Sequence, residues 1–215
     1  VTAPGWDLAT ALRVAVLGLG CAAVTLLFCH TLHLANRLLP RFLPNPWLRA
    51  AAGGAAVLAF TLVINSTRYN GAGTDVIAQA VEQGQALPWD FLCKILFTAI
   101  TLAAGFKGGE VVPSFYVGAT FGCVAAPLLG LPAGFGAALG LAAVFCGATN
   151  TLVPSLVLAV ELFGAPGLLY YAVVCGVCYA LTGYAGLYSH QTFLTAKLHP
   201  EYHAEIHPHH KPPET

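Results

Sequence analysis

The chain has 215 residues, of which 57% are hydrophobic and only 8% are charged, and its formal net charge is zero. Soluble domains carry about 25% charged residues, so this composition indicates a protein that lies within a membrane. The few Lys and Arg residues are scattered along the chain, which excludes a basic surface for nucleic acid. The sequence contains no Met and begins at Val1 without a basic leader, so we interpret it as a piece of a longer protein.

The seven Cys residues lie almost entirely within apolar runs, where cysteine behaves as a small hydrophobic side chain. We therefore expect no disulfide framework. Cys175 and Cys178 have the spacing of a redox motif, but they lie in an apolar helical run without a βαβ context. Redox catalysis is not predicted.

The first predicted element is an apolar run at residues 7–39, which is more than long enough to cross a bilayer core of about 30 Å and should be tilted. A proline-stiffened turn at residues 39–46 follows. Arg37, Arg41 and Arg49 cluster around this turn, which by the positive-inside rule places it on the cytoplasmic side.

The middle of the chain contains an apolar run rich in small residues and then a polar stretch. Residues 47–64 are rich in Ala and Gly, so we expect this helix to pack closely against its neighbours. A polar stretch at residues 65–85 follows, and residues 73–81 within it have a Thr/Asp cap and helical apolar spacing. This pattern predicts a short interfacial or re-entrant helix.

The remaining apolar runs are interrupted by Gly, Pro, Asn and Thr, and several are too short to cross a bilayer alone. They predict helices at residues 89–104, 112–129, 133–148, 153–163 and 167–181. A modest helix is expected at residues 187–198. The polar tail at residues 201–215 is rich in His and Pro and is predicted to be disordered.

A glycine-rich turn at residues 105–110 separates two of these helices, and Pro113 fits the start of the second one. The first N–H groups of a helix have no intrahelical partner, and the peptide dipoles add positive potential there, so this end attracts anions. At bilayer depth, irregular backbone survives only where it is buried in protein or lines a wet cavity. A helix broken in mid-membrane therefore indicates an ion site of a transporter.

The motif Gly108-Gly109-Glu110-Val111-Val112-Pro113 resembles the Gly-Gly-x-Phe-x-Pro filter in the second half of the CLC family of chloride channels and proton-coupled chloride antiporters. Three further matches follow in the family's order: Gly118-Ala119-x-x-Gly122, Glu161 at the end of its Leu-Ala-Val-Glu segment, and Gly186-Leu187-Tyr188-Ser189. The resemblance extends to about residue 200 and implies an all-α polytopic membrane fold with tilted and re-entrant helices. Residues 1–200 would form the second half of its inverted repeat.

The resemblance also implies a site. The backbone N–H groups of Glu110 and Val111 would bind the central anion, Gly108 and Gly109 would shape the filter, and the hydroxyl of Tyr188 would coordinate the ion. A tyrosine at this position favours chloride over fluoride, because the fluoride-exporting branch in general lacks it. Chloride would be the transported ligand, and no catalytic residue, metal or cofactor is expected.

Two family loops, Gly-Ser-Gly-x-Pro and Gly-x-Glu-Gly/Pro, are absent from this sequence because they belong to the first half. The rest of the polypeptide or a partner would have to supply that half of the pore. The resemblance further implies a homodimer that uses residues 153–162 and 167–181. It places the protein in a lipid bilayer, as an integral protein of a bacterial inner membrane with a cytoplasmic C-terminus.

Several residues have a second interpretation. A carboxylate 4 Å from an anion would repel it by about 4 kcal/mol at an effective dielectric constant of 20, so Glu110 should point away, pair with Lys107 or be protonated. Tyr188 could instead belong to an interfacial aromatic belt. An ionisable residue in an apolar run is functional or paired, which leaves both roles open for Glu161. For the tail histidines we favour adventitious metal binding over a metal site.

Two other functions compete with anion transport. The segment 71–75 is superficially similar to the Gly-x-Gly-Asp motif of intramembrane aspartyl proteases, but it has one extra residue and no partner motif. A secondary transporter of another ion or solute could use the same broken helices. A cation path would need acidic residues in mid-membrane, whereas the helix start beside Lys107 favours an anion. The gating glutamate and the proton-relay residues, which distinguish a channel from an antiporter, would lie in the missing half.

Overall fold

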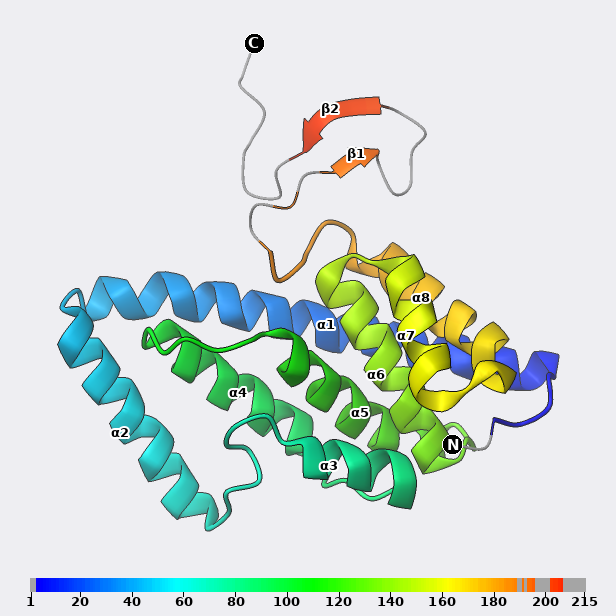
Figure 1. The fold of residues 1–215 in the computed structure, drawn as a ribbon, viewed down its shortest axis with the longest axis horizontal. Helices are drawn as coiled ribbons and strands as arrows, with labels where there is room; N and C mark the ends of the chain where they lie inside the picture. Colours follow the sequence, from blue (N-terminus) through cyan, green and yellow to red (C-terminus); the bar gives the residue numbers. More distant parts are fainter. Residues whose placement is uncertain (1–2, 189–190, 192, 196–201, 207–215) are drawn as a thin grey trace.

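The computed structural model describes residues 3–188, 191, 193–195 and 202–206, and this part of the chain is an assembly of helices with one short strand pair at its C-terminal end (Figure 1). In chain order the helices are α1 (Leu8–Phe42), α2 (Pro46–Ile64), α3 (Thr74–Ala78), the π-helix η1 (Gln79–Gln83), α4 (Asp90–Ala103), α5 (Val111–Leu128), α6 (Ala133–Thr149), α7 (Leu152–Phe163), the 3₁₀ turn η2 (Ala165–Gly167) and α8 (Leu168–Thr182). Within the described residues, four helical segments are long and apolar enough to cross a membrane: Leu8–Phe42, Pro46–Ile64, Val111–Leu128 and Ala165–Thr182.

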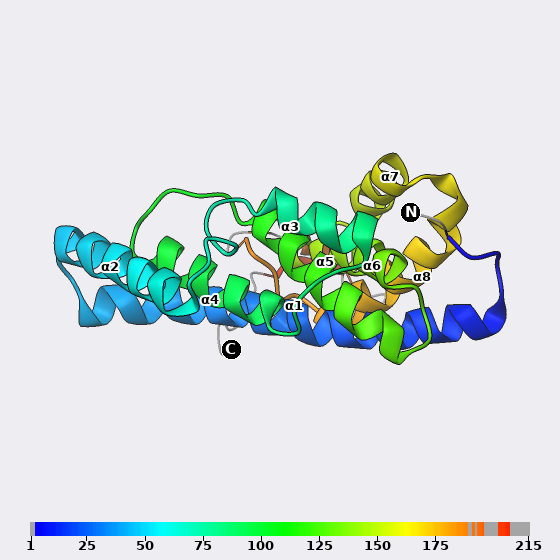
Figure 2. The ribbon, with the colours of Figure 1, turned by 90° about the horizontal axis from the view of Figure 1, so that it is seen from below.

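Helix α1 runs along the whole length of the molecule and packs against α4, α6 and α8 (Figure 2). Asp7 caps its start, because the Asp7 carboxylate accepts a hydrogen bond of 3.1 Å from the backbone N–H of Thr10. Its 35 residues span about 50 Å at 1.5 Å per residue. This length exceeds a bilayer core of about 30 Å, and the tilt expected from the sequence stays a prediction.

Helices α5 and α6 meet along a glycine contact that we call the glycine seam, formed by Gly118 and Gly122 of α5 and Gly136 and Gly140 of α6. A Cβ atom added to Gly118 would collide with the backbone oxygen of Gly140, and one added to Gly122 would collide with that of Gly136. The two backbones are therefore in direct contact. The small residues that follow the filter motif are explained by this contact.

Helix α2 is less well packed than its Ala- and Gly-rich sequence predicts. Gly53 is its only buried residue and lies against Ala104 at the end of α4. Leu58, Leu62 and Val63 are exposed. The expectation of close packing was wrong for most of this helix, because its small residues permit a close approach on one face only. The other face is left for lipid or for protein outside this chain.

A buried polar cluster joins the loop after α2 to the first turn of α4. Asp90 is completely buried and accepts hydrogen bonds from the Arg68 guanidinium at 3.0 Å, the Tyr69 hydroxyl at 2.8 Å and the backbone N–H of Leu87 at 2.9 Å. Arg68 also donates to Gln79 Oε1 at 3.0 Å, which ties in η1. These bonds saturate the carboxylate and fix the loop across α4.

The end of the described chain differs from the expectation. Residues 187–198 were predicted to form a helix, but their described part contains strand β1 (Phe193–Thr195), which pairs antiparallel with β2 (Tyr202–Ile206). β2 lies within the segment predicted to be disordered, and residues 207–215 are outside the described part. All seven Cys residues are free, in agreement with the sequence.

The glycine seam predicts that Gly122→Ala destabilises the protein by about 3 kcal/mol, because the new methyl group must push two backbones apart. Gly54→Ala is the matched control, since its Cβ would make only an ordinary 3.6 Å contact with Phe106. Thermal unfolding of the full-length parent protein in detergent measures both. Equal stability of the two variants would contradict the seam.

The polar cluster predicts a second stability effect. Asp90→Asn removes the charge that pairs with Arg68 and should cost about 2–3 kcal/mol, a discounted value because the Arg68 side chain is 22% exposed. Asp75→Asn is the control, because Asp75 is exposed. If chemical or thermal denaturation finds the two variants equally stable, the cluster does not hold this part of the fold together.

Candidate functional site

The turn between α4 and α5 ends one helix and starts the next. Helix α4 closes with hydrogen bonds from the N–H groups of Ala104, Gly105 and Phe106 to carbonyls of its last turn, at 2.9, 3.0 and 3.3 Å. Gly105 has φ = 98°, a backbone conformation that side-chain-bearing residues rarely adopt. The glycine therefore lets the chain leave α4 and enter the exposed segment at residues 106–109.

Helix α5 begins at Val111 and has no side-chain cap at Glu110. The Glu110 carbonyl accepts a 3.2 Å bond from the N–H of Ser114, but within the described chain no protein acceptor is found for the N–H groups of Glu110 and Val111. A Cβ atom added to Gly109 would meet no atom within 4 Å. The predicted filter residues thus form a helix N-terminus with free amides and open space beside it.

The Glu110 side chain does not pair with Lys107, because Arg68–Asp90 is the single Lys or Arg ion pair among the residues described. The charge of His33 of α1 acts on the Glu110 carboxyl. Partial burial raises the pKa of the Glu110 carboxyl, and the positive charge of His33 opposes that shift. Glu110 is therefore easier to protonate than an exposed glutamate, and of the three possibilities raised by the sequence only pairing with Lys107 is excluded.

Tyr188 follows a segment that is tied to α1 and α6. His33 donates through Nε2 to the Gly186 carbonyl at 2.8 Å, and the N–H of Leu187 donates to the Ala148 carbonyl at 2.8 Å. Tyr188 itself is 47% exposed. His33 thus links the segment before Tyr188 with the charge of Glu110, whereas the joint binding of an ion by Tyr188 and the start of α5 stays a prediction.

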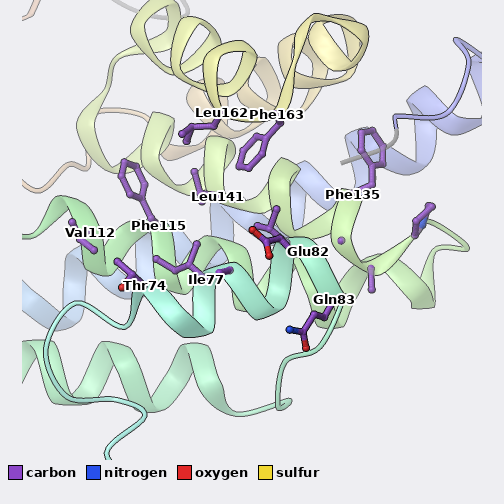
Figure 3. A pocket seen from close by; sticks show the side chains of 16 residues that line it. Thr74, Ile77, Glu82, Gln83, Val112, Phe115, Phe135, Leu141, Leu162 and Phe163 are labelled. Atoms are coloured by element: carbon purple, nitrogen blue, oxygen red, sulfur yellow. The ribbon is translucent and has the colours of Figure 1, made fainter.

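Two cavities reach the start of α5, and they differ in charge. One, of about 480 Å³, is lined by Gly108, Gly109, Lys94 and Lys107, among others. The other, of about 1050 Å³, lies between α3–η1 and α7, with Leu162 and Phe163 facing Ile77 and Glu82 across it (Figure 3). Glu82 is the one charged residue in the lining of the larger cavity. The smaller, positively charged cavity therefore suits an anion and the larger does not.

Other candidates from the sequence do not join this site. Glu161 is exposed on α7 and makes no ion pair within the described chain. No group of three possible metal ligands occurs among the described residues, and the side chains of the tail histidines lie outside them. Sequence reasoning missed His33 and Lys94. The spacing of Asp90 and Lys94, four residues apart in an apolar helix, was the available signal for the latter.

The chain is similar to known proteins over most of its length. Residues 1–183 match the family model for voltage-gated chloride channels. A chloride/fluoride channel protein of Pseudomonas syringae pv. tomato (strain ATCC BAA-871 / DC3000) is 37% identical over 194 residues, which cover 87% of this chain and 43% of the relative. The crystal structure of a CLC-type fluoride/proton antiporter superposes with a TM-score of 0.83 at 34% identity, covering 87% of this chain and 48% of that one.

The chain thus spans about half the length of the relatives it matches. The all-α architecture agrees with the solved antiporter, and the predicted filter lies within the matched residues. We conclude that the chain belongs to the voltage-gated chloride channel family, known as CLC.

Proposed function

We propose that this chain supplies the second half of the pathway in a membrane transporter of small monovalent anions. The observation that carries the proposal is the start of α5, where the N–H groups of Glu110 and Val111 are free and open space adjoins Gly109. Fixed dipoles of this kind stabilise a partly dehydrated anion. They also hold it less tightly than a permanent charge in the filter would, which allows release.

We place fluoride first and chloride second among the candidate ions. The Pseudomonas relative is named for chloride and fluoride, and the solved structure is named as a fluoride/proton antiporter. The preference for chloride drawn from Tyr188 finds no support in these names. Tyr188 would still contribute its hydroxyl as a hydrogen-bond donor, since a phenol O–H can donate to any halide.

Glu110 has two roles in this proposal. Its backbone N–H donates to the anion, and its side chain takes up a proton when the anion is present. The raised pKa of the carboxyl supports this, because a higher pKa increases the protonated fraction at a given pH. Neutralisation removes a repulsion of about 4 kcal/mol at 4 Å and an effective dielectric constant of 20.

The remaining surfaces are assigned to partners. We propose that the first half of the pathway covers the exposed turn at residues 106–109. A second copy would cover the apolar residues exposed on α7 and α8, among them Val153, Val157 and Leu169. Arg37, Arg41 and Arg49, which lie in α1 and α2 on either side of the loop at residues 43–45, would face the cytoplasm of a bacterial cell.

Gly109→Val is predicted to lower anion flux at least about tenfold, a loss of 1.4 kcal/mol in ion stabilisation, because its side chain would fill the space beside the free amides. Fluoride and chloride flux are measured with proton movement in liposomes containing the full-length parent. Stability should not change, and Gly54→Ala should transport as the wild type does. Absence of any anion flux in the wild type would refute the proposed function.

Tyr188→Phe tests the second part of the site. Loss of one hydrogen bond of about 1 kcal/mol should raise the half-saturating anion concentration about fivefold. Tyr171→Phe is the control, because the Tyr171 hydroxyl is buried without a hydrogen-bond partner in the described structure. A Tyr188 variant with unchanged concentration dependence would remove this hydroxyl from the pathway and leave the α5 amides as the site.

A further inference from the structure

Lys94 of α4 is a buried cation that the proposed filter does not use. Lys94 is only 2% exposed to solvent. Its ammonium donates to the backbone carbonyls of Tyr69 at 3.2 Å and Gly71 at 2.6 Å and lies 4.9 Å from the centre of the Tyr116 ring. These are neutral partners, so none of them compensates the charge.

The nearest acid along the helix is not available to Lys94. Asp90 lies one turn earlier, but its carboxylate already accepts hydrogen bonds from Arg68, Tyr69 and Leu87. Within the described chain no carboxylate lies in ion-pair range of Lys94. Arg68, Asp90 and Lys94 together therefore carry a net charge of one positive unit in a buried region, and burying such an uncompensated charge is costly.

Lys94 borders a cavity that extends to the proposed filter. Lys94 lines the cavity of about 480 Å³ whose wall also includes Gly108 and Gly109, the residues just before the start of α5. An ammonium group has three protons to donate. Two of them are donated to the carbonyls of the segment at residues 69–71, and the third has no hydrogen-bond acceptor within the described chain.

We propose that Lys94 forms a second anion-binding site, separate from the amides of α5, which holds a small monovalent anion in this cavity. The inference rests on the proposed function, because the cavity would then be a waiting position for an ion that enters the filter. A single negative charge balances the net positive charge of Arg68, Asp90 and Lys94. One hydrogen bond from Lys94 then holds the ion weakly enough for release. Thr98 and Thr101, which also line the cavity, make its wall polar near the ion.

The experiment uses the full-length parent protein with Lys94→Gln and Lys94→Arg. The glutamine can still donate to backbone carbonyls but carries no charge, whereas the arginine keeps the charge. Lys94→Gln should raise the half-saturating anion concentration for flux about tenfold with little change in maximal flux, and Lys94→Arg should restore most of the wild-type value. Crystals of the wild type grown in bromide should show anomalous density within hydrogen-bond distance of Lys94 Nζ.

The outcomes separate this inference from the proposed function. If wild-type protein transports anions but bromide is absent at Lys94, or if Lys94→Gln keeps the wild-type concentration dependence, the second site is refuted and Lys94 only fixes the loop at residues 69–71. If Lys94→Gln does not fold, the bromide density in the wild type alone decides. If the wild type moves no anion, the proposed function fails, while bromide density at Lys94 would still establish a binding site.

Discussion

The contact between α5 and α6 is the constraint on which the candidate site depends. Because Gly118 and Gly122 lie directly against the backbone of α6, helix α5 has one possible depth and rotation in the bundle. The position of its free N-terminus is therefore fixed by the packing of Gly118 and Gly122 further along the helix. Interactions of the turn itself do not fix it. An uncapped helix end keeps a defined position only where the rest of the helix is firmly packed.

Partial charges of backbone amides and full charges of side chains both lie near this helix end. The amides of Glu110 and Val111 provide partial positive charge, and full charges are carried by Glu110 and Lys107 of the turn and by side chains on other helices. His33 of α1 interacts with Glu110 and donates to the segment that precedes Tyr188, while Lys94 of α4 lines the cavity that leads to Gly109. Weak dipoles at the filter and stronger charges at a distance are compatible with both entry and release of an anion.

The described chain, which spans about half the length of its relatives, has large exposed apolar surfaces. Apolar residues on α2, α7 and α8 and the turn at residues 106–109 are uncovered here. The same burial argument explains why the expected packing of α2 was wrong. An Ala- and Gly-rich helix can approach a neighbour closely, but only the tertiary structure determines whether a neighbour of this chain is there, and for α2 only Gly53 has one.

The sequence alone determined the membrane setting, most of the helices up to residue 182 and the broken helix at the glycine turn, because hydropathy, Gly and Pro act locally. The turn predicted at residues 39–46 was wrong at its start, since α1 continues through Pro40 to Phe42. It also identified Gly108 to Val111 and Tyr188 by resemblance, although their ion-binding roles stay predictions. It failed at residues 187–198, where strand β1 depends on pairing with β2. Only the tertiary structure brought His33 to Glu110 and left Lys94 without an acid, because partners from distant segments decide where a charge is compensated.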